Sequence, residues 1–449
     1  MVIGVVCVSA GFCSAQTNPP AAATVLPFAP LHEYTSRTDR RTEPYPDKPL
    51  NIGPPGSIFR DPNFGSPILR VTGIGSDPHE GNRSLMTPSS AEQNSWNSDS
   101  TFFYVTTIGG SFLLYRFDPS TMIVRAVGAN PDLGSEPAFS FTSPNILYGM
   151  SRQERRISQY DISSGRTITL NNPAKCVKLG FGDYGTFMSV SGDDKRFLAV
   201  FGPQQDKNYL VYVYDREQGC RWYNTLTGEI SGQWGPRGTI SFPGRFPVHN
   251  ARLAKSGKFL YVQPGGGQAW VVWDVETMHV DACASGCGGH HAMGYSHIVG
   301  SSENTHPLDL WLRPLEHLNT HIALVPAIEA VKGYWYDSHF SWNNTDADDS
   351  TPVCFSTYRP DNPMLPGSTP RVSGPWENEI DCAETDGKSS KIWRFAHTYS
   401  TARNGFWSTP RGNISPDGRF FMFTSDWEDQ LGRQPNGQYR SDVFIVELK

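Results

Sequence analysis

Charge and long apolar runs are both scarce in this sequence. Only 18% of the 449 residues are Asp, Glu, Lys or Arg, and the formal net charge of −6 is spread along the chain without a basic block. Such a chain lacks the electrostatic footprint of a nucleic-acid binder, so we expect no nucleic-acid partner. The apolar run over residues 2–12 is too short to span a bilayer comfortably. We therefore expect no membrane anchor.

Two catalytic signatures are also missing. No Gly-x-Ser-x-Gly segment occurs, so the chain does not carry the nucleophile elbow of an α/β-hydrolase. The glycine-rich segment at residues 264–267 is not followed by a helical pattern. We interpret it as a turn between strands rather than a phosphate-binding loop. No organic cofactor is expected.

Turn residues and aromatic side chains, by contrast, are plentiful. The chain contains 43 Gly and 35 Pro, and 12% of its residues are Phe, Trp or Tyr. This mixture is typical of all-β proteins with many turns, and 449 residues are enough for a large core. The composition therefore favours an all-β fold.

Residues 1–15 have most features of a secretion signal. The apolar run is followed by Cys13-Ser14-Ala15, whose small side chains suit a signal-peptidase site. A basic segment ahead of the run is missing, and a buried N-terminal strand is the alternative interpretation. We expect cleavage after residue 15 and a secreted or periplasmic protein. Residues 16–48 lack periodicity and are expected to form an extended leader or a clamp across the surface.

Six cysteines remain after that cleavage, and an even number in an exported protein favours disulfides. Neighbours along the chain suggest three pairs, namely Cys176 with Cys220, Cys283 with Cys287, and Cys354 with Cys382. Zinc binding by Cys283 and Cys287 with His290 or His291 is the alternative.

A two-part repeat runs through the rest of the chain. One half is an apolar strand, a turn of Ser, Asp and Gly, and a second apolar strand. Its copies lie at residues 96–103, 191–198, 253–260 and 414–421. The other half is an aromatic residue followed by Asp, at residues 117–118, 160–161, 214–215 and 273–274. Asp and Ser suit such turns because their short side chains bond the backbone two residues further on.

Repeated units of four strands indicate a β-propeller, and counting them predicts seven four-stranded blades in one domain over residues 49–449. A β-sandwich is the alternative, but it does not explain the double pattern. Residues 55–75 contain Ile68-Leu69-Arg70-Val71 and are expected to supply the strand that closes the ring with the last blade. The blades are expected near residues 93–128, 136–172, 184–230, 247–283, 289–330, 337–400 and 405–449.

Residues ahead of each Ser-Asp-Gly turn are expected at one mouth of the central channel, because each blade begins with its innermost strand. The loop at residues 397–403, which carries Tyr399 and Arg403, is expected on the same face. A single inner-strand histidine is more often a satisfied polar group than a ligand, but three at equivalent positions favour a site. Aligned on the turns, the blades contribute Gln93, His249, Arg252, His291, His339 and Arg411.

This set of side chains suits two kinds of chemistry. Imidazoles with one amide oxygen can bind manganese, zinc or a similar ion, and His, Tyr and Arg can serve as base, acid and anion receptor. No pair of carboxylates occupies the aligned positions, which disfavours a two-carboxylate glycoside hydrolase.

The turn at residues 415–421 resembles the repeat of TolB-type propellers. With the inner-strand histidines and Gln93, the chain resembles the oligogalacturonate lyases and, more loosely, the propeller ulvan lyases. Those families cleave uronate-containing polysaccharides by β-elimination. The resemblance implies an acidic polysaccharide or oligosaccharide as substrate. It also implies a divalent metal (manganese, zinc or calcium) held by His291 and His339 with Gln93.

The resemblance further implies an acid and a base. His249 is the first candidate for the base that removes the C5 proton of the uronate. Tyr295 and Tyr399 are the candidates for the acid that protonates the departing O4.

Arg252, Arg403 or Arg411, or the cation, would neutralise the uronate carboxylate. Arg411 and Trp342 are expected to contact the sugar, although most tryptophans are expected to pack between blades. We expect a monomer. The rival hypothesis is a non-catalytic binding propeller that presents its funnel to a protein or a glycan.

Overall fold

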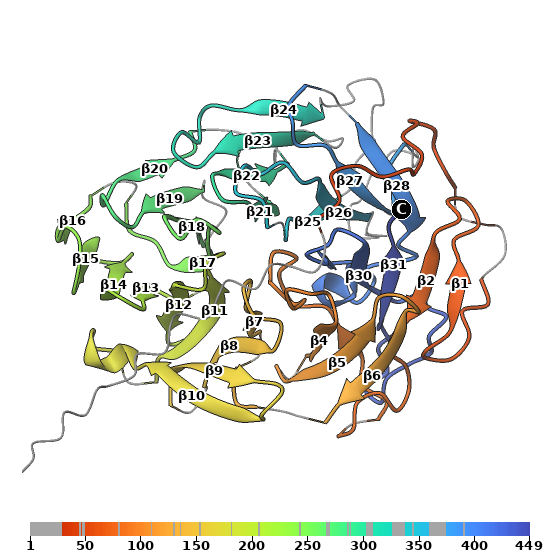
Figure 1. Ribbon diagram of the computed structural model, residues 1–449, viewed down its shortest axis with the longest axis horizontal. Helices are drawn as coiled ribbons and strands as arrows, with labels where there is room; N and C mark the ends of the chain where they lie inside the picture. The colour runs from red at the N-terminus through yellow and green to blue at the C-terminus, as the bar shows by residue number, and fades with distance from the viewer. Residues whose placement is uncertain are drawn as a thin grey trace, which may run out of the picture.

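The computed structural model places seven antiparallel sheets around a central axis like the blades of a propeller (Figure 1). Within the described residues, the helical elements are two short 3₁₀ segments, η1 (Pro173–Lys175) and η2 (Gly405–Ser408). The predicted all-β, seven-bladed fold is confirmed. The structure describes residues 29–449 except 45, 47–49, 80, 109, 129–130, 135, 152–153, 181, 205–206, 242–243, 266–269, 285–286, 288, 302–308, 326–336, 344, 359–373 and 389–390.

The first four blades follow one another along the chain, each starting from its innermost strand. Blade one contains β3 (Leu85–Met86), β4 (Phe102–Thr107), β5 (Phe112–Asp118) and β6 (Ile123–Val127). Blade two contains β7 (Ala138–Phe139), β8 (Ile146–Met150), β9 (Ile157–Asp161) and β10 (Arg166–Asn171). Blade three contains β11 (Tyr184–Val190), β12 (Arg196–Gly202), β13 (Leu210–Asp215), β14 (Gly219–Asn224), β15 (Glu229–Gly232) and β16 (Gly238–Thr239). Blade four contains β17 (Val248–Leu253), β18 (Phe259–Pro264), β19 (Val271–Asp274) and β20 (Val280–Ala282).

The last three blades complete the ring, and the first two strands of the chain close it. Blade five contains β21 (His291–Met293), β22 (His297–Gly300), β23 (Leu310–Pro314) and β24 (Ile322–Val325). Blade six contains β25 (Asp337–Ser341), β26 (Val353–Tyr358), β27 (Glu379–Ala383) and β28 (Ile392–His397). Blade seven contains β29 (Gly412–Ile414), β30 (Phe420–Ser425), β31 (Asp442–Glu447), β2 (Pro67–Arg70) and β1 (Ile58–Arg60).

Ring closure is provided by the predicted segment. Ile68 pairs with Val446 and Leu69 with Ile445, so that β2 continues the sheet begun by β29–β31. Leu69 and Ile445 then pack in one apolar cluster with Trp96 of blade one. Burial of apolar surface between the first and last blades therefore holds the ring together.

Two kinds of side-chain hydrogen bond recur in the repeated turns of several blades. The Asp that ends the third strand of blades one to four accepts a hydrogen bond from the backbone N–H two residues further on, at 2.8–2.9 Å. In the other turn, Ser191 accepts from Arg196 N at 2.9 Å and Ser415 accepts from Phe420 N at 3.0 Å. Local side-chain chemistry thus defines the repeat, as expected.

Two blades depart from the expected boundaries. Blade one begins at Leu85 rather than near residue 93, because its inner strand is interrupted. Leu85 pairs with Thr107, and the chain returns to the sheet only at Trp96, which bridges to Phe103. Aligning the blades on the turn that follows the inner strand locates only the half of this strand next to the turn, at Trp96. Blade three has six strands instead of four, because β15 and β16 extend its outer edge.

The six cysteines pair as neighbours along the chain, as predicted. The Cα atoms are 6.4 Å apart in Cys176–Cys220, 6.0 Å in Cys283–Cys287 and 4.0 Å in Cys354–Cys382. The bond between Cys283 and Cys287 leaves no thiolate for the zinc alternative.

The described part of the leader lies against blades six and seven. Tyr34 is buried with Trp393 and Phe395, and its hydroxyl donates to the carbonyl oxygen of Gly418 at 2.9 Å. The backbone N–H of Arg394 donates to the carbonyl oxygen of Arg37 at 3.0 Å.

Residues 1–15, the expected secretion signal, lie outside the described residues. Among the described residues, no helix has the length and hydropathy needed to cross a membrane.

Removing the Tyr34 ring should destabilise the propeller. We expect Tyr34→Ala to lower the free energy of unfolding by roughly 3–5 kcal/mol, the range for truncation of a buried large aromatic side chain. Tyr34→Phe keeps the ring and loses the contacts of the hydroxyl with the carbonyl oxygen of Gly418 and with Sγ of Cys354, so it should cost about 1 kcal/mol. Urea denaturation of both variants measures this. If Tyr34→Ala had the same free energy of unfolding as the unaltered protein, the leader would not pack on the blades in solution.

Candidate functional site

A cavity of about 610 Å³ opens where the inner strands of blades four, five and six meet at the centre of the ring. Its wall contains four of the residues that the sequence analysis singled out. His249 and Arg252 lie on β17, His291 begins β21, and His339 lies in β25. Their convergence follows from the radial arrangement, because each inner strand starts at the same mouth of the channel. We call this space the funnel.

Arg252 is the funnel residue with the least satisfied side chain. It is 3% exposed, and its Nε, Nη1 and Nη2 atoms have no hydrogen-bond partner among the described residues. Its guanidinium carbon lies 5.4 Å from the centre of the Phe187 ring. A buried charge without a partner is unfavourable, so this arrangement suits a site where the ligand brings the anion.

His290 forms an acid–base pair with a carboxylate at the wall of the funnel. Its Nδ1 lies 2.8 Å from the carbonyl oxygen of Ser338 and 3.3 Å from Oδ1 of Asp337. Burial by itself would lower the pKa of His290, but the charge of Asp337 outweighs it and raises the pKa. Tyr358 donates to the other oxygen of Asp337 at 2.7 Å and holds the carboxylate in place.

His339 lies beside His290, and its protonation behaves in the opposite way. The centres of the two rings are 3.8 Å apart. Burial first, and then the neighbouring charge of His290, hold the pKa of His339 well below its usual range. Of the two rings, His290 therefore has the higher affinity for a proton, and His339 the lower. Opposite shifts in two adjacent groups are characteristic of acid–base sites.

His291 is held in a tight environment on the same wall. Its Nε2 lies 2.8 Å from Oε1 of Glu92, and its ring packs against those of Tyr261 and Trp270, with centres 3.8 Å and 5.1 Å away. Glu92 and His290 were not assigned to the site from the sequence. Glu92 directly precedes Gln93 in the chain, and His290 directly precedes His291. Aligning the blades on their turns therefore located the correct segments but selected the neighbouring side chain in each.

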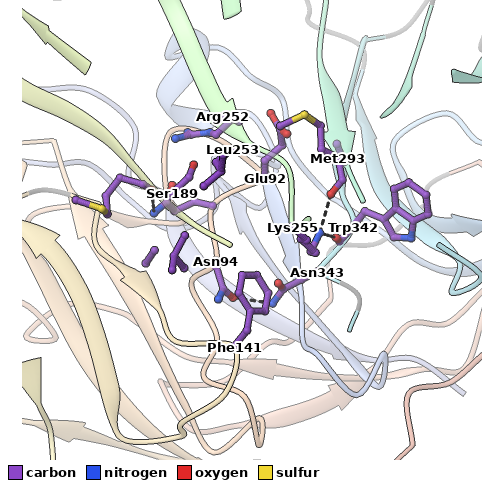
Figure 2. Close-up of a pocket in the computed structure, with 15 residues that line it drawn as sticks. Glu92, Asn94, Phe141, Ser189, Arg252, Leu253, Lys255, Met293, Trp342 and Asn343 are labelled. Carbon is purple, nitrogen blue, oxygen red and sulfur yellow. Dashed lines mark hydrogen bonds between the residues drawn. The ribbon is translucent and has the colours of Figure 1, made fainter. Parts of the chain in front are cut away.

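A smaller cavity of about 40 Å³ adjoins the funnel and shares Glu92 and Arg252 with it (Figure 2). Nζ of Lys255 donates to the carbonyl oxygens of Met293, at 2.6 Å, and Trp342. These bonds tie blades four, five and six together at the channel. Burial lowers the pKa of Lys255 to about 8, against the attraction of nearby carboxylates.

Gln93 and Trp342 line the smaller cavity and not the funnel. The amide nitrogen of Gln93 donates to the carbonyl oxygens of Glu136, Pro137 and Met188 at 2.9–3.2 Å. Trp342 is 2% exposed and belongs to the apolar core around blades five and six. Neither is brought together with His291 and His339.

Three further candidates lie away from the funnel. Tyr295 sits in the turn between β21 and β22, at the far end of the short inner strand of blade five. Tyr399 is buried and stacks on Trp427, with ring centres 4.4 Å apart. Arg403 donates to Asp429 at 2.6 Å. None of the three candidates lines the funnel.

The loop that carries Tyr399 and Arg403 reaches the funnel a few residues later, in η2. Phe406 and Trp407 line the cavity and are 42% and 37% exposed. Arg411 is fully buried behind them, with its guanidinium carbon 4.4 Å and 5.2 Å from the two ring centres. Trp407 is therefore an exception to the prediction that most tryptophans pack between blades, and its exposure became visible only in the structure.

The expected metal ligands do not form a centre. Among the described residues, no three His, Cys, Asp or Glu side chains are grouped so that they could hold a metal ion. Glu92 contacts His291, a Thr409 hydroxyl lies 3.4 Å from Nε2 of His339, and Gln93 faces the other cavity. These residues do not fit a preformed site for manganese, zinc or calcium.

The fold and the funnel define a seven-bladed β-propeller with a cavity at its centre that is lined by both charged and aromatic side chains. No protein-family model matches the sequence, and no curated protein sequence matches it. Among solved structures, an oligogalacturonate lyase in complex with manganese is similar at a TM-score of 0.54 and 12% identity, over 92% of this chain and 99% of that chain.

An oligogalacturonate lyase from Vibrio parahaemolyticus is similar at a TM-score of 0.51 and 9% identity, over 87% of this chain and 96% of that chain. TolB from Acinetobacter baumannii has a TM-score of 0.34 and 15% identity, over 58% of this chain and 60% of that chain. The predicted resemblance of the fold to the oligogalacturonate lyases is confirmed. At these identities the likeness establishes the fold and not the reaction.

Replacing Arg252 by an apolar residue should stabilise the protein. Because the guanidinium has no hydrogen-bond partner among the described residues, we expect Arg252→Met to raise the free energy of unfolding by about 1–3 kcal/mol. Arg394→Met is the control: Arg394 is buried but bonded to both carboxylate oxygens of Glu379, at 2.6 and 2.8 Å. That variant should lose roughly 3–5 kcal/mol. Loss of stability in Arg252→Met would reveal an internal partner.

The proton affinity of His290 should depend on Asp337. With Asp337→Asn the Coulomb attraction is lost and the burial effect remains, so the pKa of His290 should fall below that of a free histidine, about 6.5. A pH titration of the ring signals by NMR measures this. Asp346→Asn, which removes the partner of His32 at 3.1 Å, is the matched control. An unaltered titration of His290 in Asp337→Asn would contradict the pairing.

Proposed function

We propose that the chain is a lyase that cleaves a uronate-containing polysaccharide or oligosaccharide by β-elimination in the funnel. The observation that carries the proposal is the buried guanidinium of Arg252, which faces the funnel without a hydrogen-bond partner among the described residues. A uronate carboxylate would supply the missing anion. Neutralising the charge of this carboxylate makes the C5 proton more acidic, and removal of that proton is the difficult step of the reaction.

His249 and His290 are the proposed base and acid. His249 is exposed at the funnel wall and would take the C5 proton. The C4–O4 bond then breaks as the C4–C5 double bond forms, and His290 gives a proton to the departing O4. The raised pKa of His290 favours the protonated form that an acid needs, and Asp337 orients the ring through Nδ1.

Phe406 and Trp407 are the proposed sugar-stacking surface, in place of Trp342. Exposed aromatic faces at a cavity wall suit the apolar faces of sugar rings. Arg411 packs behind these rings as a support, with its side chain fully buried. It would therefore position the platform and not touch the substrate.

Whether turnover depends on a divalent metal is decided by adding a chelator to the reaction. One similar oligogalacturonate lyase was solved with manganese, whereas the described residues of this chain do not form a preformed metal site. Export is also proposed, and the three disulfides support it, because such bonds persist in oxidising compartments.

The test is ultraviolet absorbance during incubation with pectic, alginate, ulvan and glycosaminoglycan substrates, with and without chelator. Formation of an unsaturated uronate raises the absorbance. Arg252→Gln and His249→Ala should each lower the rate by at least about a hundredfold, with His317→Ala, on the surface, as the control. No absorbance change with any substrate, but binding that depends on Arg252, would favour the non-catalytic binding propeller.

The pH dependence gives a separate check on His290. Because the acid must be protonated, the rate should fall on the alkaline side as pH rises through the raised pKa of His290. In Asp337→Asn this alkaline limb should move to lower pH. If the alkaline limb of the pH–rate profile lies at the same pH in Asp337→Asn as in the unaltered protein, His290 is not the acid.

A further inference from the structure

A separate cavity of about 270 Å³ opens beside the funnel, over blades one to three. It has three lining residues in common with the funnel, Ser89, Phe187 and Trp407. These residues form a shared wall between the two spaces. A sugar chain bound at Arg252 would therefore enter the neighbouring cavity past Trp407, which is 37% exposed.

Phe187 shows that this wall is a specialised part of blade three. The residue has a φ of +57° within an irregularity in the pairing of β11 with β12, between Thr186 and Ser189. A bulky side chain seldom adopts such a backbone conformation, and strain of this kind is concentrated at functional sites. The bulge places one ring both against Arg252 and on the wall of the second cavity.

The lining of the second cavity differs in charge from that of the funnel. Hydroxyl groups come from Thr106, Thr107 and Thr186, and apolar surface comes from Leu133 and Met150. Among the lining residues that the structure describes, the only charged side chain is Glu136. A carboxylate in the wall repels a second uronate. The hydroxyls of Thr106 and Thr186 donate to backbone carbonyl oxygens of the chain, so they can bond an uncharged sugar as acceptors.

Glu136 is fixed in this place by the wall itself, because its carboxylate accepts the backbone N–H of Ser89. The positive charge that acts on it comes from Arg411. Arg411 is fully buried and donates to the carbonyl oxygens of Pro88 and Phe406. Arg411 does not line the second cavity, so it is not available to bind a second carboxylate there.

We propose that the second cavity is a subsite for an uncharged sugar unit next to the uronate at Arg252. The inference rests on the proposed function of the funnel. It identifies the substrate class as a polymer that combines uronate with uncharged sugar, rather than a polymer of uronate alone. Glu136 then acts as a specificity-determining residue by rejecting a carboxylate at the neighbouring position.

The test is the affinity for two probes, tetragalacturonate and a hyaluronan tetrasaccharide, measured by calorimetry in the full chain carrying His249→Ala to prevent turnover. Glu136→Gln removes the charge and keeps an oxygen that can accept the Ser89 N–H. We expect this change to tighten binding of tetragalacturonate about five- to tenfold, the effect of removing one nearby like charge. Binding of hyaluronan, whose uncharged unit can occupy the subsite, should change less than about twofold.

Glu217→Gln, an exposed residue of blade three, controls for the change in net charge. Trp407→Ala should weaken both probes, because it removes the shared wall. If tetragalacturonate binds in an Arg252-dependent manner but is unaffected by Glu136→Gln, the subsite inference is overturned and the proposed function stands. If neither probe binds, or if binding is indifferent to Arg252→Gln, the proposed uronate site fails and the subsite with it.

Discussion

The pairing of β2 with β31 is the constraint on which the rest of the molecule depends. It joins a strand near the start of the described chain to the last strand, and the apolar faces of blades seven and one then cover each other. Without this contact those faces would be exposed to water over a large area. Closure also sets the radial position of the inner strands, so β17, β21 and β25 meet at one cavity rather than lying on separate surfaces.

Two buried arginines of the propeller differ in whether their guanidinium groups are hydrogen-bonded. In blade six the buried guanidinium of Arg394 donates hydrogen bonds to both carboxylate oxygens of Glu379. At the centre, Arg252 is equally buried but has no hydrogen-bond partner among the described residues. The first arrangement serves stability, whereas the second has a cost in stability that only an incoming anion would offset. The contrast is the physical basis for assigning ligand binding to the funnel.

Local patterns predicted most of the fold and part of the site. The Asp and Ser turns are bonded within a few residues, so their repetition could be counted along the chain. The same count located the inner strands that carry His249, His291 and His339. It failed for Tyr295, because β21 is only three residues long and the tyrosine falls in the next turn. It also failed for Tyr399, which packs on Trp427 rather than facing the centre.

By itself, therefore, the sequence determined the class of fold, the number of blades, the closing strand and the disulfide pairs, since each depends on periodicity or on neighbours along the chain. Only the tertiary structure decided that Arg252 has no hydrogen-bond partner among the described residues, that Asp337 raises the pKa of His290, and that Phe187 and Trp407 line two cavities. These properties depend on desolvation and on contacts between different blades. Such contacts form when the ring closes, and no local pattern records them.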